Sequence, residues 1–139
     1  MGLSDVRAYF RTSMESLGYN EWRDGFNAEN IPSTLLDNSF HIVSGDITPT
    51  VNHQGHEFDC PITIRIFKKG FLDPVSAIDE SYIDVETIYA EILSPANRLT
   101  VDVHDVVPTG ISVNPLTLQN DNAAVVEINF NAKTFMRFS

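Results

Sequence analysis

Two stretches of the chain carry the helical repeat of apolar residues, with apolar side chains three or four positions apart. In residues 4–18 the apolar face holds Val6, Tyr9, Phe10, Met14 and Leu17. In residues 74–93 it holds Ile78, Tyr82, Val85, Tyr89 and Ile92. Ser4 and Gly18 are a favourable N-cap and a favourable stop for the first helix. Pro74 and Pro95 bound the second helix, since proline is tolerated in the first turn and not inside a helix.

Alternating apolar and polar residues predict the strands. Residues 40–43 begin one strand, and residues 58–66 form its clear return strand. Residues 45–55, which contain Pro49 and Gly55, are typical of the far end of a long hairpin. Pro61 cannot donate a backbone hydrogen bond, so we expect an edge position or a bulge there. The remaining strands are predicted at residues 100–107, continued by 110–118, and at 124–132.

The order of these elements predicts the fold class. A helix is followed by a long irregular segment (residues 19–38), a β-hairpin, a second helix and two or three strands. This order is typical of an α+β fold: an antiparallel or mixed β-sheet with a long β-hairpin and two helices packed on one face. The 139 residues are enough for one domain with its own core, so we expect a single domain spanning residues 1–139.

The composition indicates a folded, soluble protein. The hydrophobic fraction is 42%, with nine phenylalanines, which argues against disorder. Cys60 is the single cysteine, so an internal disulfide framework is excluded. No apolar run approaches the roughly 18 residues of a membrane span, and the polar start does not resemble a signal peptide. We therefore expect synthesis in the cytoplasm and no membrane partner.

The acidic charge is concentrated in the second predicted helix. The net charge is −10, which argues against sequence-independent binding of nucleic acid. Between Lys69 and Arg98 the chain has no basic residue and six carboxylates, which are Asp73, Asp79, Glu80, Asp84, Glu86 and Glu91. The helical repeat places Glu80, Asp84 and Glu91 opposite the apolar face. Because like charges one turn apart repel each other, such a helix is solvated, faces a basic partner, or lines a passage where negative charge is useful.

Two sets of residues could be drawn as catalytic or metal sites, and the pattern favours neither. His53, His56, Asp59 and Cys60 lie within eight positions, but no known zinc-binding spacing supports a metal site. Alternation also places Asp59 and Cys60 on opposite faces of their strand. Apolar neighbours indicate that Cys60 is a buried, inert thiol. Solvated carboxylates on a polar helix face are poor acid–base pairs, so we predict no enzymatic activity and no cofactor.

Apolar residues outside the regular elements suggest contact surfaces, because partners tend to bury such residues. They occur in the long segment, at the hairpin tip and in the C-terminal tail. The candidates for an interface are Trp22, Phe26, Ile47, Pro49, Val51, Phe135, Met136 and Phe138. Trp22 and Phe26 have an equally good alternative, which is packing on their own core.

Taken together, the chain resembles the tail-terminator (tail-completion) proteins of long-tailed bacteriophages. The resemblance rests on LGY at residues 17–19, NIPSTLLDNSFHIV at 30–43 and DCPITIRIFKKG at 59–70. The acidic helix and the closing strand VVEINFNAKTF at 125–135 complete it. These are patterns of order and spacing along most of the chain, and they include no catalytic motif.

The resemblance implies a structural virion protein at the head-proximal end of the phage tail. Such proteins form a hexameric ring that caps the tail tube, stops its polymerisation and joins the tail to the neck. The implied partners are further copies of the chain, the major tail tube protein and a neck or head-completion protein. DNA passes through the lumen without specific binding. Glu80, Asp84 and Glu91 are then candidates for the lumen or for a basic neighbouring ring.

Two other functions are compatible with the sequence. The chain could be a neck or head-completion protein that binds the connector. It could also belong to a different class, as a small acidic inhibitor that imitates the charge of nucleic acid. An inhibitor would be monomeric or dimeric, whereas a terminator would form rings or assemble when it meets the tube.

Overall fold

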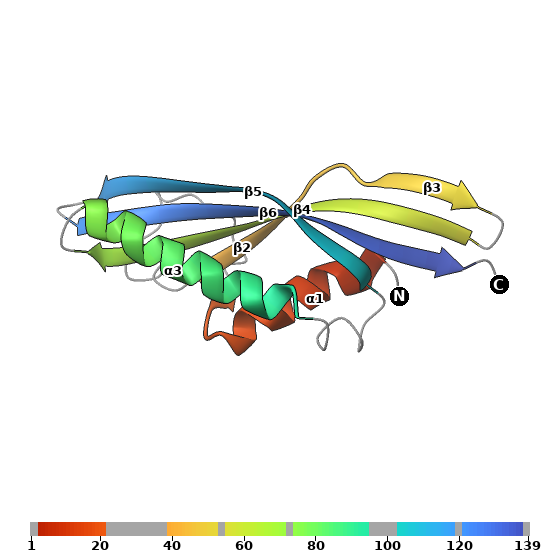
Figure 1. The fold of residues 1–139 in the computed structure, drawn as a ribbon, viewed down its shortest axis with the longest axis horizontal. Coiled ribbons are helices and arrows are strands. Elements are labelled where there is room, and N and C mark those ends of the chain that lie inside the picture. Colours follow the sequence, from red (N-terminus) through yellow and green to blue (C-terminus); the bar gives the residue numbers. More distant parts are fainter. Residues whose placement is uncertain are drawn as a thin grey trace.

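A computed structural model shows one β-sheet with two helices on the same side (Figure 1). The structure describes residues 3–21, 39–52, 55–71, 74–94, 103–118 and 121–137. The elements in chain order are α1 (Leu3–Ser16), β1 (Asn20–Glu21), β2 (Ser39–Ser44), β3 (Thr48–Asn52), β4 (Gly55–Phe71), α3 (Pro74–Ile92), β5 (Val103–Leu118) and β6 (Asp121–Arg137). This arrangement confirms the predicted α+β fold with a mixed sheet and a long hairpin.

The sheet is built around the antiparallel pair β4 and β6. The strand order is β1-β2-β4-β6-β5, and β3 also pairs with β4. Only β1 and β2 are parallel among the strand pairs of the described residues. The β4–β6 register runs from Gly55 opposite Arg137 to Phe71 opposite Asn122. Beyond the ends of both helices, β3, β4 and β6 continue as an arm (Figure 1).

The first side of the long hairpin, which pairs with β4, is divided into the two strands β2 and β3. β2 pairs with the carboxyl half of β4 and β3 with its amino half. Between them, the Gly45 N–H donates a hydrogen bond of 2.8 Å to the Pro61 carbonyl oxygen. A Cβ at Gly45 would lie 3.1 Å from the Pro61 Cβ, so this close approach favours glycine. In a strand, the N–H and C=O groups of one residue point to the same neighbouring strand. The Pro61 carbonyl points to Gly45, so the side on which Pro61 lacks an N–H faces the gap between β2 and β3. β4 is not an edge strand, because β6 pairs with it on the other side, but neither β2 nor β3 pairs with Pro61, so the predicted loss of pairing at this residue is confirmed.

α1 ends as predicted and begins differently. Gly18 has a φ of 94°, and its N–H donates to the Glu15 carbonyl oxygen at 3.0 Å. This left-handed conformation is the usual glycine stop of a helix. The helix begins at Leu3, so Ser4 lies within it. The predicted capping role of Ser4 is therefore wrong.

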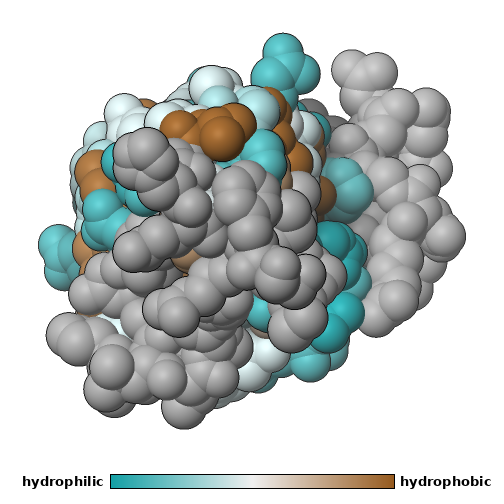
Figure 2. Space-filling view, turned by 90° about the vertical axis from the view of Figure 1, so that its right-hand side faces the viewer, coloured by the Kyte–Doolittle hydropathy of each residue, from teal (hydrophilic) through white to brown (hydrophobic). Residues whose placement is uncertain are grey.

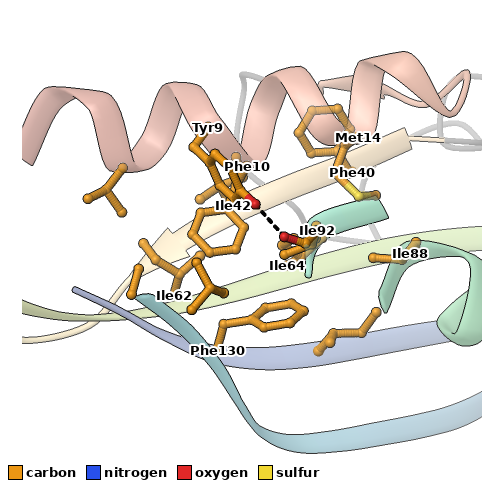
Figure 3. Packing of buried hydrophobic residues seen from close by; sticks show 14 of the residues in the cluster. Tyr9, Phe10, Met14, Phe40, Ile42, Ile62, Ile64, Ile88, Ile92 and Phe130 are labelled. Carbon is orange, nitrogen blue, oxygen red and sulfur yellow. Dashed lines mark hydrogen bonds between the residues drawn. The ribbon is translucent and has the colours of Figure 1, made fainter. Parts of the chain in front are cut away.

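The core fills the space between the sheet and the helices (Figure 3). Alternate residues of β6 are buried on this inner face, among them Ile128 and Phe130. The Phe130 ring lies 5.5 Å from that of Phe10 and 5.6 Å from that of Tyr89, measured between centroids. Phe130 of β6 thus contacts both α1 and α3. The Tyr9 hydroxyl also donates a hydrogen bond to the Ile92 carbonyl oxygen, which joins α1 to the end of α3.

The buried face of α3 is rotated from its predicted position. Its fully covered residues are Ser81, Val85, Ile88 and Ile92. Of the predicted stripe, Val85 and Ile92 are buried, Ile78 and Tyr89 are half-buried, and Tyr82 is 55% exposed. The prediction erred because apolar residues occupy more than half of the helix circumference. Ile88 and the small Ser81 complete the face that contacts the sheet, and the Tyr82 side stays partly uncovered.

We expect Phe130→Ala to destabilise the fold strongly. Removing this fully buried ring leaves a cavity between both helices and the sheet, at a cost of about 3 to 5 kcal/mol in the free energy of unfolding. Urea denaturation followed by circular dichroism measures this loss. The exposed Thr12→Ala on α1 is the control and should stay within about 0.5 kcal/mol of the native protein. A loss below about 1 kcal/mol for Phe130→Ala would contradict the packing described above.

Candidate functional site

The carboxylates of α3 lie in different surroundings. Asp79, Glu80 and Glu86 are exposed, whereas Asp84 and Glu91 are half-buried. The Ser16 hydroxyl donates a hydrogen bond of 3.1 Å to Glu91 Oε1, so Glu91 contacts the end of α1. The predicted position opposite the buried face is therefore wrong for Asp84 and Glu91. Asp84 and Glu91 lie on the flank towards α1 and the segment after it, and of the three predicted residues only Glu80 is exposed.

Tyr19 is the titratable group that these surroundings change most clearly. Burial and, to a smaller extent, the negative charge of Asp84 together raise the pKa of Tyr19 to about 12. Both effects favour the neutral phenol, because each disfavours a second negative charge beside the helix. Asp84 is therefore part of the contact between α3 and the segment after α1.

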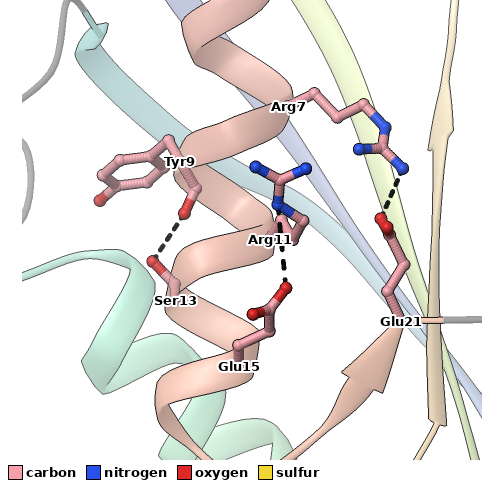
Figure 4. A network of polar contacts seen from close by, with 6 residues as sticks. All are labelled: Arg7, Tyr9, Arg11, Ser13, Glu15 and Glu21. Carbon is pink, nitrogen blue, oxygen red and sulfur yellow. Dashed lines mark hydrogen bonds and ion pairs between the residues drawn. The ribbon is translucent and has the colours of Figure 1, made fainter.

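The cations of α1 are matched by carboxylates nearby (Figure 4). Arg7 forms an ion pair with Glu21 of β1, whose side chain is only 4% exposed. Arg11 lies 3.8 Å from Glu15, one turn further along the helix. A polar hollow of about 380 Å³ lies between the end of α1 and β1, and it is lined by Glu15, Gly18, Tyr19, Asn20 and Glu21. The Arg7–Glu21 ion pair holds β1 beside α1, and both Arg7 and Arg11 have a carboxylate nearby.

The helix-free face of the sheet carries polar pairs across β4 and β6. Arg65 Nε lies 3.4 Å from Glu127 Oε1, and the two residues are directly opposite in the register. Lys133 Nζ lies 3.7 Å from Asp59 Oδ1 and 3.8 Å from Glu57 Oε1. The sequence shows these charges, but only the register brings them together. Charge on this face is therefore largely paired.

An apolar groove lies between α3 and β5. It has a volume of about 390 Å³ and is lined by Tyr82, Val85, Glu86, Ile111 and Val113. Ile111 is 47% exposed, and Val75 and Ile83 of α3 are also exposed. Sequence reasoning missed this surface because it assigned Tyr82 to the core and treated residues 110–118 only as a strand. The surplus of apolar positions on α3 was the available signal.

The predicted interface residues are only partly within the described chain. Ile47, Pro49 and Val51 are exposed along and before β3, with Val51 64% exposed. Phe135 is half-buried in β6, and Met136 lies opposite His56 in the register. Trp22, Phe26 and Phe138 lie outside the described residues. Figure 2 views the end of the molecule with the arm, where hydrophobic patches lie among hydrophilic ones.

Cys60 has the environment of a core residue. It is 2% exposed, and burial raises the pKa of its thiol, with a smaller contribution from the charge of Asp59. A raised pKa lowers the thiolate fraction, so the geometry does not favour a nucleophile. Within the described ranges, which omit His53, no group of three or more His, Cys, Asp or Glu residues could hold a metal ion. No helix in the described part of the chain is long and apolar enough to cross a membrane.

Comparison with known proteins identifies no relative: no protein-family model matches this chain, and no curated protein matches it significantly.

The raised pKa of Tyr19 predicts a loss of stability at high pH. The folded pKa of about 12 lies above the ordinary value of 10.0, so the stabilisation is complete below pH 10 and is lost between about pH 10 and 12. Burial also raises the pKa of Tyr89, so titration of tyrosinate absorbance in the folded protein should show a late phase of which Tyr19→Phe removes one part. Asp84→Asn should lower this late pKa. An unchanged late phase in Tyr19→Phe would contradict the assignment.

Proposed function

We propose that this protein is a structural virion subunit of the tail-terminator type, forming a ring at the head-proximal end of a phage tail tube. The observation that carries the proposal is an open sheet with two unlike edges. Within the described residues, β5 has a strand on one side only, and β3 and the short β1 stand at the opposite side. Two different surfaces that fit each other give heterologous contacts, which close into rings when the rotation allows.

Exposed apolar residues support contacts at both edges. Val51 on β3 and Val107 on β5 are 64% and 44% exposed. Open edges of this length are usually protected by charges, prolines or bulges. β5 contains Pro108 and Pro115 and a register shift between Pro108 and Gly110, which limits open-ended pairing. In the proposed ring, the β5 edge of one copy contacts the arm of the next copy.

The charge distribution suits a ring that DNA crosses. An edge-to-edge ring turns the helix-free face of the sheet one way and the helices the other. The helix side carries the exposed carboxylates Asp79, Glu80 and Glu86, whereas the opposite face carries the paired charges of Arg65 and Lys133. Neither surface attracts phosphates, as expected for a channel that DNA passes without binding. For the proposed lumen role of Glu80, Asp84 and Glu91, Glu80 is the best candidate because it is the only exposed residue of the three.

The alternatives differ in what they bind. A neck or head-completion protein would use the same unlike edges and bind the connector in place of the tube. An acidic inhibitor that imitates nucleic acid would need a continuous charged surface. The paired charges across β4 and β6 and the apolar groove beside α3 favour the assembly subunit over the inhibitor.

The mass of the particle in solution tests the ring. Native mass spectrometry with negative-stain images should show closed rings, alone or after mixing with tail tubes, in place of a 15.5 kDa monomer. Val51→Lys and Val107→Lys should shift the mass towards the monomer, because a lysine on a strand edge opposes pairing. Thr12→Lys on the exposed side of α1 is the matched control and should leave rings intact. A protein that stays monomeric in the presence of tubes would contradict the proposal.

A further inference from the structure

The apolar surface of α3 is larger than its own sheet can cover. The core takes the side of the helix with Ser81, Val85 and Ile88. The neighbouring side, with Tyr82, is left next to β5, where Ile111 is also exposed. A groove of about 390 Å³ between two regular elements is within the size range of binding pockets. The combination is typical of a surface that a partner segment covers.

The charge around the groove specifies the partner. Glu86 is exposed and lines the groove itself, and Asp79 is exposed one turn before Tyr82. Residues 74–92 contain five carboxylates and no Lys, Arg or His. On the β5 side the lining residues are Ile111 and Val113, which are uncharged. An apolar floor with an unmatched carboxylate at its side complements an apolar side chain flanked by cations.

We propose that the groove between α3 and β5 is a docking site for a basic, amphipathic segment of another protein. One large apolar side chain of that segment packs between Tyr82 and Ile111. A Lys or Arg beside it pairs with Glu86. This site lies on the helix side of the sheet and uses neither Val51 nor the edge position of Val107. The inference therefore goes beyond ring formation and can fail or hold independently of it.

Rigid regular elements position the site. Val85 is buried and anchors the groove side of α3 on the sheet, while Val113 lies opposite Val126 in the β5–β6 register. The groove is thus formed before a partner arrives, which reduces the entropic cost of binding. Aromatic residues such as Tyr82 often dominate the binding energy of such sites.

Binding of a defined peptide tests the proposal. The probe is a short fluorescent peptide in which leucines are interleaved with lysines, and its counterpart has glutamates in place of the lysines. The lysine peptide should bind, and the double variant Tyr82→Ala with Ile111→Ser should weaken binding at least about tenfold. Glu86→Gln should weaken it about threefold and reduce its salt dependence. Ala90→Ser, on the exposed side of the same helix, is the matched control and should bind like the native protein.

Three results would overturn the docking site. The glutamate peptide could bind as tightly as the lysine peptide, or the groove variant could bind the lysine peptide like the native protein. In the third, the groove variant lowers the mass of the native assembly, which would assign the groove to a second copy of the chain. Since both groove residues are largely exposed, circular dichroism should show that the variants fold. Ring mass is measured on the same samples, so loss of peptide binding and loss of rings are separate results.

Discussion

The long antiparallel pairing of β4 with β6 is the constraint on which the rest of the structure depends. Its register sets which residues of both strands face the helices and which face away. The inner set includes Ile64 and Ile128, which form the floor of the core. The outer set brings Arg65 opposite Glu127 and leaves a polar face. The same pair continues past the helices as the arm, so one pairing produces the core, the open face and the proposed contact region.

Both helices pack on the sheet through Phe130. This packing leaves the Tyr82 side of α3 uncovered. Phe10 and Tyr89 both contact the Phe130 ring. The bond from Tyr9 to the Ile92 carbonyl keeps the end of α3 beside α1. α3 is thereby turned so that Ile88 faces the sheet and Tyr82 faces the groove beside β5. Core packing and the proposed docking site are consequences of the same helix rotation.

The sequence predicts the elements well and their contacts less well, for physical reasons. Hydrophobic periodicity located α1, α3 and the hairpin because each is amphipathic over several turns or alternations. It misplaced the face of α3 because apolar residues extend around more than half of that helix, and only the sheet decides which are buried. The ion pairs of Arg65 and Lys133 depend on strand register, which one sequence does not specify. The acidic helix was recognised, but the separate surroundings of Glu80 and Glu91 follow from the position of α1.

A tail terminator needs unlike edges that close a ring, a lumen that does not hold DNA, and a surface for the next protein in the particle. The open sheet, the exposed carboxylates of α3 and the groove beside Tyr82 fit these needs. The most direct measurement is the length of tail tubes assembled from the purified tube protein, with and without this protein, in electron micrographs. The account predicts shorter tubes, each with a ring at one end. Tubes of unchanged length with bare ends would contradict it.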